Sequence, residues 1–252
     1  MKRKTEPKSF EEIIGATWRK MKKEWDKPEF QVALTRAQAK HDEQKRAEAE
    51  AELDMRGVPA DPKVRAVALS DKPHETPALF WVQEGNRWRQ THRGSPLVQV
   101  LSGPAGTGKT AGCCWLVRRT YGACCVYASR VTSTPENAWP DNQNLWKRWR
   151  TAPLLLIAEL GDERGDAGVI SSLIGERYND ARATLCTTNL SRADFERRYL
   201  TERLRSRLQN AQAQGLEGLG TLVARGCPWW IDTGTDDLRD PQVALRVLGA
   251  TR

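Results

Sequence analysis

Short apolar runs alternate with helix-length segments from about residue 96 onward. Five of these runs have the length of buried strands, which predicts strands at 97–101, 123–128, 154–158, 184–188 and 229–232. The segments between them predict helices at 108–120, 141–150, 167–180, 192–198 and 200–213. Regular alternation of strands and helices predicts an α/β fold, in which helices cover both faces of a five-stranded parallel sheet.

The beginning of the chain has a different pattern. Ser9 and Glu12 form a capping box, which predicts a helix from about residue 10, and apolar residues then recur at helical spacing. Residues 29–56 predict a second, long helix that is rich in Ala, Glu, Gln and Lys. Its apolar stripe is thin, so this helix needs a partner or stands in solvent.

The segment after this helix contains four prolines between residues 57 and 77, which indicate a linker. Two short strand-like runs then flank Glu84-Gly85-Asn86, which indicates a hairpin. We therefore expect three regions: a helical N-terminal region at 1–56, a linker with a hairpin at 57–95, and the α/β domain at 96–252.

Charge and composition narrow the function only slightly. The net charge is +8 and the pI is about 9.3, which permits binding to nucleic acid but does not require it. No apolar run is long enough to span a bilayer, and no apolar segment follows the basic start, so we expect neither a membrane protein nor a secretory signal. The six cysteines show no zinc-ligand spacing and mostly lie in apolar runs, which favours a reducing, cytoplasmic location.

The strongest motif follows the first strand of the α/β domain. Its residues are Gly103, Pro104, Ala105, Gly106, Thr107, Gly108, Lys109 and Thr110, which match the phosphate-binding P-loop. The glycines let several backbone N–H groups point at one phosphate, and the following helix adds the positive end of its dipole. We expect Lys109 to reach the β and γ phosphates and Thr110 to offer its hydroxyl to Mg²⁺.

Further motifs follow in a defined order. A buried strand ends in Ala158-Glu159, where a Walker B carboxylate is expected, and is followed by Arg177-Tyr178, Thr187-Thr188-Asn189, Arg203-x-x-x-Arg207 and a terminal segment with Arg239. This order resembles the AAA+ ATPases of the DnaC/IstB type, which include bacterial and phage helicase loaders and transposition ATPases. The resemblance covers about residues 97–240 and implies an ATPase that uses ATP and Mg²⁺.

The resemblance also implies roles for single residues. Glu159 is the general base, Asn189 orients the attacking water, Arg207 reaches the γ-phosphate of a neighbouring subunit and Arg239 touches the phosphates in its own subunit. Each arginine stabilises charge that spreads over the transition state. Asn189 has a competing interpretation as a helix cap, and Arg207 as part of a solvated arginine-rich face.

Two departures from the family stand out. Leu238 precedes Arg239, where the family carries an aromatic residue. Ala158 stands where the family has the aspartate that holds the water shell of Mg²⁺. The metal is then held mainly by Thr110, the phosphates and water, so we expect slow hydrolysis unless Asp162 or Glu163 substitutes.

Partners follow from the resemblance and from the N-terminal helices. A helicase loader implies a replicative helicase held through residues 1–56, contact with single-stranded DNA, and self-association through the ATP site. Self-packing of the two N-terminal helices is an equal alternative for 1–56. Trp146 and Trp149 lie among cations, a pattern that suits base stacking, but their spacing favours packing on the core.

The sequence is compatible with three alternative functions. An IstB-like transposition ATPase has the same motifs, and a weakly hydrolysing adaptor that uses ATP as structural support is suggested by Ala158. A small-molecule kinase is disfavoured by the Thr-Thr-Asn strand end and the arginine box.

Overall fold

The computed structural model describes residues 25, 27–73, 75–91, 94, 96–214 and 229–234. The chain divides into two units, Met1–Ala51 and Glu52–Arg252. The predicted helix that starts near residue 10 and the terminal segment with Arg239 both lie outside the described residues.

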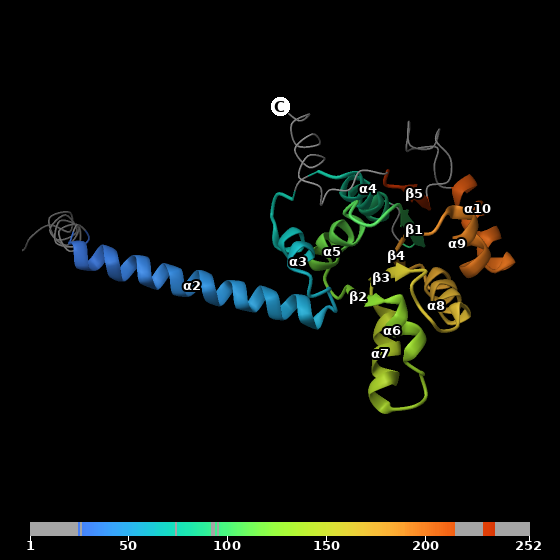
Figure 1. The fold of residues 1–252 in the computed structure, drawn as a ribbon, viewed down its shortest axis with the longest axis horizontal. Coiled ribbons are helices and arrows are strands. Elements are labelled where there is room, and N and C mark those ends of the chain that lie inside the picture. Colours follow the sequence, from blue (N-terminus) through green and yellow to red (C-terminus); the bar gives the residue numbers. More distant parts are fainter. Residues whose placement is uncertain are drawn as a thin grey trace, which may run out of the picture. The chain divides into compact units, whose positions relative to one another are not determined.

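The second unit is built on a five-stranded sheet (Figure 1). Its strands are β1 (Leu97–Ser102), β2 (Cys124–Tyr127), β3 (Leu154–Leu160), β4 (Ala183–Thr188) and β5 (Trp230–Asp232). They lie in the order β2-β3-β4-β1-β5, and every neighbouring pair is parallel. The predicted α/β fold and all five predicted strands are confirmed. Strands β1, β3 and β4 are almost entirely buried, as expected for strands covered on both faces.

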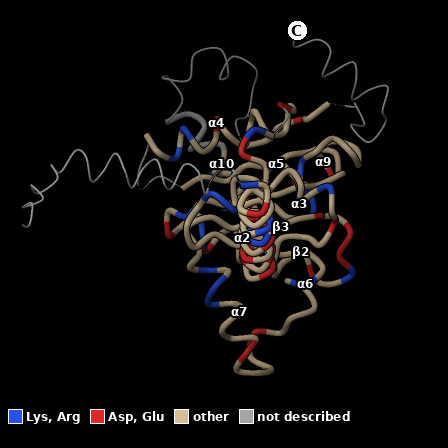
Figure 2. The backbone as a smooth tube through the Cα atoms, turned by 90° about the vertical axis from the view of Figure 1, so that its left-hand side faces the viewer, with Lys and Arg blue, Asp and Glu red and all other residues tan. Residues whose placement is uncertain are grey.

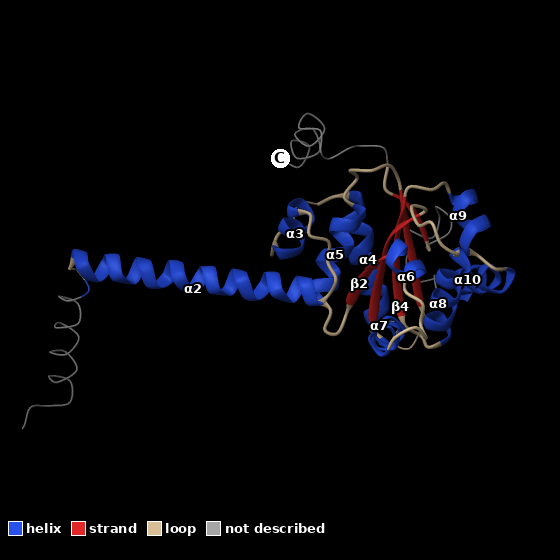
Figure 3. Cartoon of the chain, turned by 60° about the horizontal axis from the view of Figure 1, so that its bottom comes forward, coloured by secondary structure: helices blue, strands red, loops and turns tan. Residues whose placement is uncertain are grey.

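Helices cover both faces of this sheet (Figure 3). On one face, an apolar cluster joins the sheet to α3 (Pro62–Leu69), α4 (Pro77–Thr91) and α5 (Lys109–Arg119). On the other, a second cluster joins it to α6 (Ala128–Ser133), α7 (Pro140–Thr151), α8 (Ala167–Asn179), α9 (Arg192–Tyr199) and α10 (Glu202–Gln214). The five predicted helices of this domain are confirmed to within a few residues, and α6 was not predicted.

The predicted hairpin at 78–90 is wrong, because these residues form helix α4. Thr76 caps this helix by accepting a hydrogen bond from Leu79 N at 3.1 Å. Ala78, Leu79 and Val82 form one buried face with the spacing of a helix. Burial of this face favours a helix over two short strands.

The predicted linker is likewise packed into the second unit. Pro62 stands in the first turn of α3, and Pro77 begins α4, so these prolines mark helix starts rather than an extended linker. Asp61 caps α3, and the buried side chains of Leu53 and Val58 already belong to the core cluster on the α5 face. The compact unit therefore begins near residue 52 and not near residue 96.

Helix α2 (Pro28–Met55) confirms the predicted long polar helix. Charges of both signs occur along it (Figure 2), and none of its described residues before Leu53 is buried. Trp25 and Phe30 place their ring centroids 6.1 Å apart near its start, and their exposed fractions are 48% and 43%. Among the described residues, no helix has both the length and the apolar character that crossing a bilayer requires.

Arg177 holds α7, α8 and β4 together. Its side chain is fully buried, and its guanidinium donates to Thr184 Oγ1 at 3.0 Å and to the carbonyl oxygens of Trp149, Ala152 and Ala183 among others. Burial lowers the pKa of Arg177 to about 10. The arginine of the Arg177-Tyr178 pair therefore has a structural role, because it provides hydrogen bonds to backbone carbonyl oxygens that are buried and need partners.

Candidate nucleotide-binding site

The P-loop motif forms the expected strand–loop–helix turn. The loop leaves β1 after Ser102, and α5 begins at Lys109. Gly103, Gly106 and Gly108 have φ values of 147°, 92° and 78°, a region that side-chain-bearing residues rarely adopt. These three glycines therefore allow the loop to curl over the N-terminus of α5, where backbone N–H groups favour an anion.

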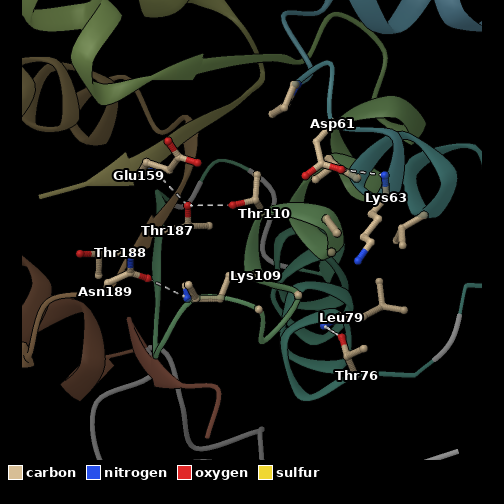
Figure 4. Close-up of a pocket in the computed structure, with 18 of the residues that line it drawn as sticks. Asp61, Lys63, Thr76, Leu79, Lys109, Thr110, Glu159, Thr187, Thr188 and Asn189 are labelled. Atoms are coloured by element: carbon tan, nitrogen blue, oxygen red, sulfur yellow. Dashed lines mark hydrogen bonds between the residues drawn. The ribbon is translucent and has the colours of Figure 1, made fainter. Parts of the chain in front are cut away.

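Lys109 is folded against this loop and is only 7% exposed. Its Nζ donates to the carbonyl oxygens of Gly103 and Pro104 at 2.6 and 2.8 Å. It also donates to Asn189 Oδ1 at 3.1 Å, from the end of β4 (Figure 4). The ammonium of Lys109 therefore connects the loop after β1 to the end of β4.

Asn189 directly follows β4. The alternative that it caps α9 is excluded, because Ser191 is the cap and accepts from Asp194 N at 3.2 Å. Thr188, just before Asn189, is tied to β3 by donating to Leu160 O at 2.7 Å. The side chain of Asn189 is therefore held at the strand end and contacts Lys109.

Thr187 lies between Thr110 and Glu159 and contacts both of them. Thr110 Oγ1 lies 3.5 Å from Thr187 Oγ1, and the same Thr187 oxygen accepts from Glu159 N at 3.2 Å (Figure 4). Thr187 belongs to a predicted motif, but no role for it follows from the sequence alone. In the structure it links the hydroxyl expected to bind the metal to the strand end that carries the expected general base.

A bulge in β3 exposes Glu159. The register with β4 shifts between Ile157 and Leu160, and Glu159 has a φ of 61°, which is strained for a residue with a side chain. Leu160 consequently lies in the same apolar cluster as Ile157, while Glu159 points out of the sheet into a cavity. Partial burial raises the pKa of Glu159, and the nearby charge of Asp162 raises it further. A raised pKa suits a carboxylate that accepts a proton.

Asp162 and Glu163, the two carboxylates suggested as substitutes for the missing aspartate, have different environments in the structure. Ala158 is fully buried in the apolar cluster that contains Cys113 and Cys114 of α5. Glu163 is buried too: Gly161 N donates to it at 2.9 Å, Tyr199 Oη donates to it, and Arg198 pairs with it at 2.7 Å. Asp162, in contrast, lines the cavity beside Glu159.

The cavity extends well beyond the loop and has a volume of about 600 Å³. One end is lined by the P-loop, Thr110, Glu159 and Asn189, and the other by residues of the segment predicted to be a linker (Figure 4). This second end includes Asp61, Val64, Val67, Thr76 and Leu79. Sequence reasoning missed it, because nothing in these residues alone shows that α3 and α4 pack on α5.

Tyr127 is a further lining residue that the sequence did not indicate. It ends β2 directly beside Ala158 of β3. Burial and the charge of Glu159 together raise the pKa of Tyr127 to about 12. Its position follows from sheet order, which places the end of β2 beside that of β3.

The arginines of the predicted box lie away from this cavity. Arg207 on α10 donates to Asn179 Oδ1 at the end of α8, and its carbonyl oxygen accepts from Tyr178 Oη at 3.2 Å. Arg203 is exposed on the same helix. Neither lines the cavity of its own chain.

The two tryptophans of α7 are packing residues, as their spacing favours. Trp146 and Trp149 are 4% and 3% exposed, and their rings meet edge to face with centroids 5.2 Å apart. Arg150 pairs with Glu136 and Glu176. Bases cannot stack on these rings in this structure.

These observations define a P-loop protein of the α/β class, with one strand, β4, between the loop-bearing β1 and the carboxylate-bearing β3. No protein-family model and no curated protein matches the sequence.

Solved structures of similar fold include the crystal structure of the DnaI, with 17% identity, a TM-score of 0.45, and coverage of 67% of this chain and 93% of that one. They also include AMPPCP-bound DnaA from Aquifex aeolicus, with 15% identity, a TM-score of 0.43, and coverage of 67% of this chain. This chain matches 51% of that DnaA chain, about half its length.

Proposed function

We propose that this chain binds ATP in the cavity between the P-loop and helices α3 and α4. The observation that carries the proposal is the convergence of Lys109, Thr110 and Asn189 at one end of a cavity of about 600 Å³. Residues 103–110 hold the phosphates. The base and ribose lie toward the apolar side chains of Val64, Val67 and Leu79.

Mg²⁺ fits the oxygen atoms at this end of the cavity. Thr110, Glu159 and Asp162 all line it, and Mg²⁺ prefers one or two protein oxygens together with phosphates and water. In the part of the chain that the structure describes, no three His, Cys, Asp or Glu side chains form a metal cage. Thr110 would be the direct ligand of the ion, which would supply positive charge against the phosphates.

In this proposal the chain hydrolyses ATP slowly. Glu159 accepts the proton of the attacking water, for which its raised pKa is suited, and Asn189 orients that water. Arg207 acts on the site of a neighbouring copy, and Arg239 acts in its own. Titration with a fluorescent ATP analogue, followed by phosphate release with and without Mg²⁺, tests binding and turnover separately.

The wider role we propose is that of an ATP-dependent loader that places a replicative helicase on single-stranded DNA. It is supported by the order of motifs over residues 97–240, and by the exposed pair of Trp25 and Phe30 near the start of a helix with no buried residue before Leu53. DNA contact rests on this resemblance and on the net charge of +8, because the tryptophans of α7 are buried. A transposase partner is the alternative, and affinity capture from the native host distinguishes the two.

Removing residues 1–51 should abolish capture of the partner and leave ATP binding unchanged. The cut falls at 51 because Leu53 and Val58 belong to the core of the second unit, and Cys125 N donates to Arg56 O at 2.7 Å. Capture from host extract and ATP titration are measured on the full and the shortened chain. Equal capture by both would place the docking surface in residues 52–252.

Replacing Ala158 with aspartate should raise ATP turnover about tenfold and lower the magnesium concentration required. A carboxylate at this strand end would order the water shell of the ion, which an alanine cannot do. The side chain is buried among apolar groups, so both Ala158→Asp and the neutral control Ala158→Asn should lower thermal stability. Phosphate release across a magnesium series is measured for each. If Asp is no faster than the native alanine, Asp162 already orders the metal shell.

A further inference from the structure

A threonine outside the motif contacts the phosphate loop from the end of β5. Thr233 directly follows β5 and is 3% exposed. Its backbone N donates to Ser102 O at 2.8 Å, and its hydroxyl donates to the same oxygen at 2.9 Å. Thr233 Oγ1 also lies 2.9 Å from Oγ1 of Thr107, the fifth residue of the loop. The end of β5 thus contacts both the residue before the loop and the middle of the loop.

Each of the two hydroxyl groups also has a backbone acceptor. Thr233 can donate to Ser102 O at 2.9 Å and Thr107 to Pro104 O at 3.2 Å, and either threonine can be the donor in the contact between them. In both arrangements one hydroxyl donates to the other, and the second donates to a backbone carbonyl oxygen. The two threonines and the loop backbone therefore form one connected chain of hydrogen bonds. Lys109 Nζ lies 3.4 Å from Thr107 Oγ1, farther than from its three other acceptors.

The path of the loop is also shaped by Thr233. Gly103 has a φ of 147°, and a Cβ atom on it would lie 2.5 Å from Thr233 Oγ1 and 3.1 Å from Gly234 O. The first residue of the loop consequently passes against this hydroxyl with no room for a side chain. Thr107 is itself 2% exposed, so its contact with Thr233 is shielded from water.

We propose that Thr233 is a positioning residue of the nucleotide site. It holds Thr107, and through it the loop, in the phosphate-binding shape before a nucleotide arrives. This inference rests on the proposed ATP binding at the P-loop. A loop that is already ordered loses less conformational entropy on binding, so removing the Thr233 hydroxyl weakens affinity although this hydroxyl lies behind the loop.

The test compares Thr233→Val, which removes the hydroxyl at nearly constant volume, with Thr233→Ser, which keeps it. We expect Val to weaken ATP affinity about tenfold and Ser to restore affinity to within about twofold of the native value. The matched control is Thr184→Val. Thr184 is equally buried in the same sheet, and its hydroxyl accepts from Arg177 Nε at 3.0 Å, away from the loop. It should lower thermal stability and leave ATP affinity unchanged.

Thr107→Val removes the other hydroxyl of the contact, and it replaces Thr233→Val in the test if that variant does not fold. We expect the same loss of ATP affinity. Where both fold, the double variant should bind no more weakly than either single variant. Native affinity in Thr233→Val, or equal losses in its Val and Ser variants, would overturn the positioning role. Failure of the ATP proposal looks different: the native chain would not bind ATP, and Lys109→Ala would change nothing.

Discussion

Replacing Lys109 with alanine should weaken ATP binding at least about a hundredfold while leaving the second unit folded. The native ammonium already lies among oxygen acceptors, at 2.6 and 2.8 Å from two loop carbonyls and 3.1 Å from Asn189 Oδ1. A phosphate entering the loop gains a charge-assisted hydrogen bond from this group, and alanine removes both the charge and the donor. Titration with a fluorescent ATP analogue measures the loss.

The matched control is Lys147→Ala, because Lys147 is exposed on α7, outside the cavity. It removes the same charge from the chain and should leave ATP affinity unchanged. Thermal unfolding without nucleotide shows whether either variant is destabilised. Native affinity in Lys109→Ala would remove the phosphate-site assignment, and equal losses in both variants would point to a general effect of net charge.

The centre of the sheet could be predicted from the sequence because β1, β3 and β4 are buried on both faces. Such strands appear as continuous apolar runs, and 154–158 is fully buried as its composition predicts. Helix α4 could not be predicted in the same way. Glu84, Gly85 and Asn86 in its middle resemble a turn. Only the fit of Ala78 and Leu79 against Gly112 of α5 shows which face is buried.

The site residues that belong to short continuous motifs could be predicted from the sequence. Lys109 follows from the loop motif, and Asn189 from its place after a strand, and the structure brings the two together. Thr233 and Tyr127 were not predictable, because each enters the site through a strand neighbour that is distant in sequence. Sheet order, which the sequence does not state, decides which strand ends meet at the cavity.

The position of a carboxylate after a strand is also insufficient to predict whether it reaches the cavity. Asp162 and Glu163 are adjacent and looked equivalent in the sequence. The turn at Gly161 directs Glu163 inward to Arg198 and Tyr199, and leaves Asp162 at the cavity. A buried and paired carboxylate is costly to separate from its partners, so Glu163 stabilises this turn and does not bind a metal in the cavity.

Replacing Arg207 with alanine should reduce ATP turnover by the assembled protein about a thousandfold and leave ATP binding nearly unchanged. Within its own chain, Arg207 lies against Asn179 and Tyr178 at the end of α8, on the face of the sheet opposite α5. It cannot serve the cavity beside α5 from there. An arginine that stabilises the γ-phosphate from this position must do so in a neighbouring copy of the chain.

Mixing tests this action between copies. Arg207→Ala keeps an intact P-loop, and Lys109→Ala keeps an intact Arg207, so a mixed assembly contains sites where both are present. Turnover should therefore recover on mixing, although neither variant is active alone. Arg197→Ala is the control, since Arg197 is an exposed arginine on α9 that pairs with Asp194, and its loss should leave turnover unchanged. If both variants fold and associate but the mixture stays inactive, Arg207 does not act on a neighbouring site, and its contact with Asn179 is its role.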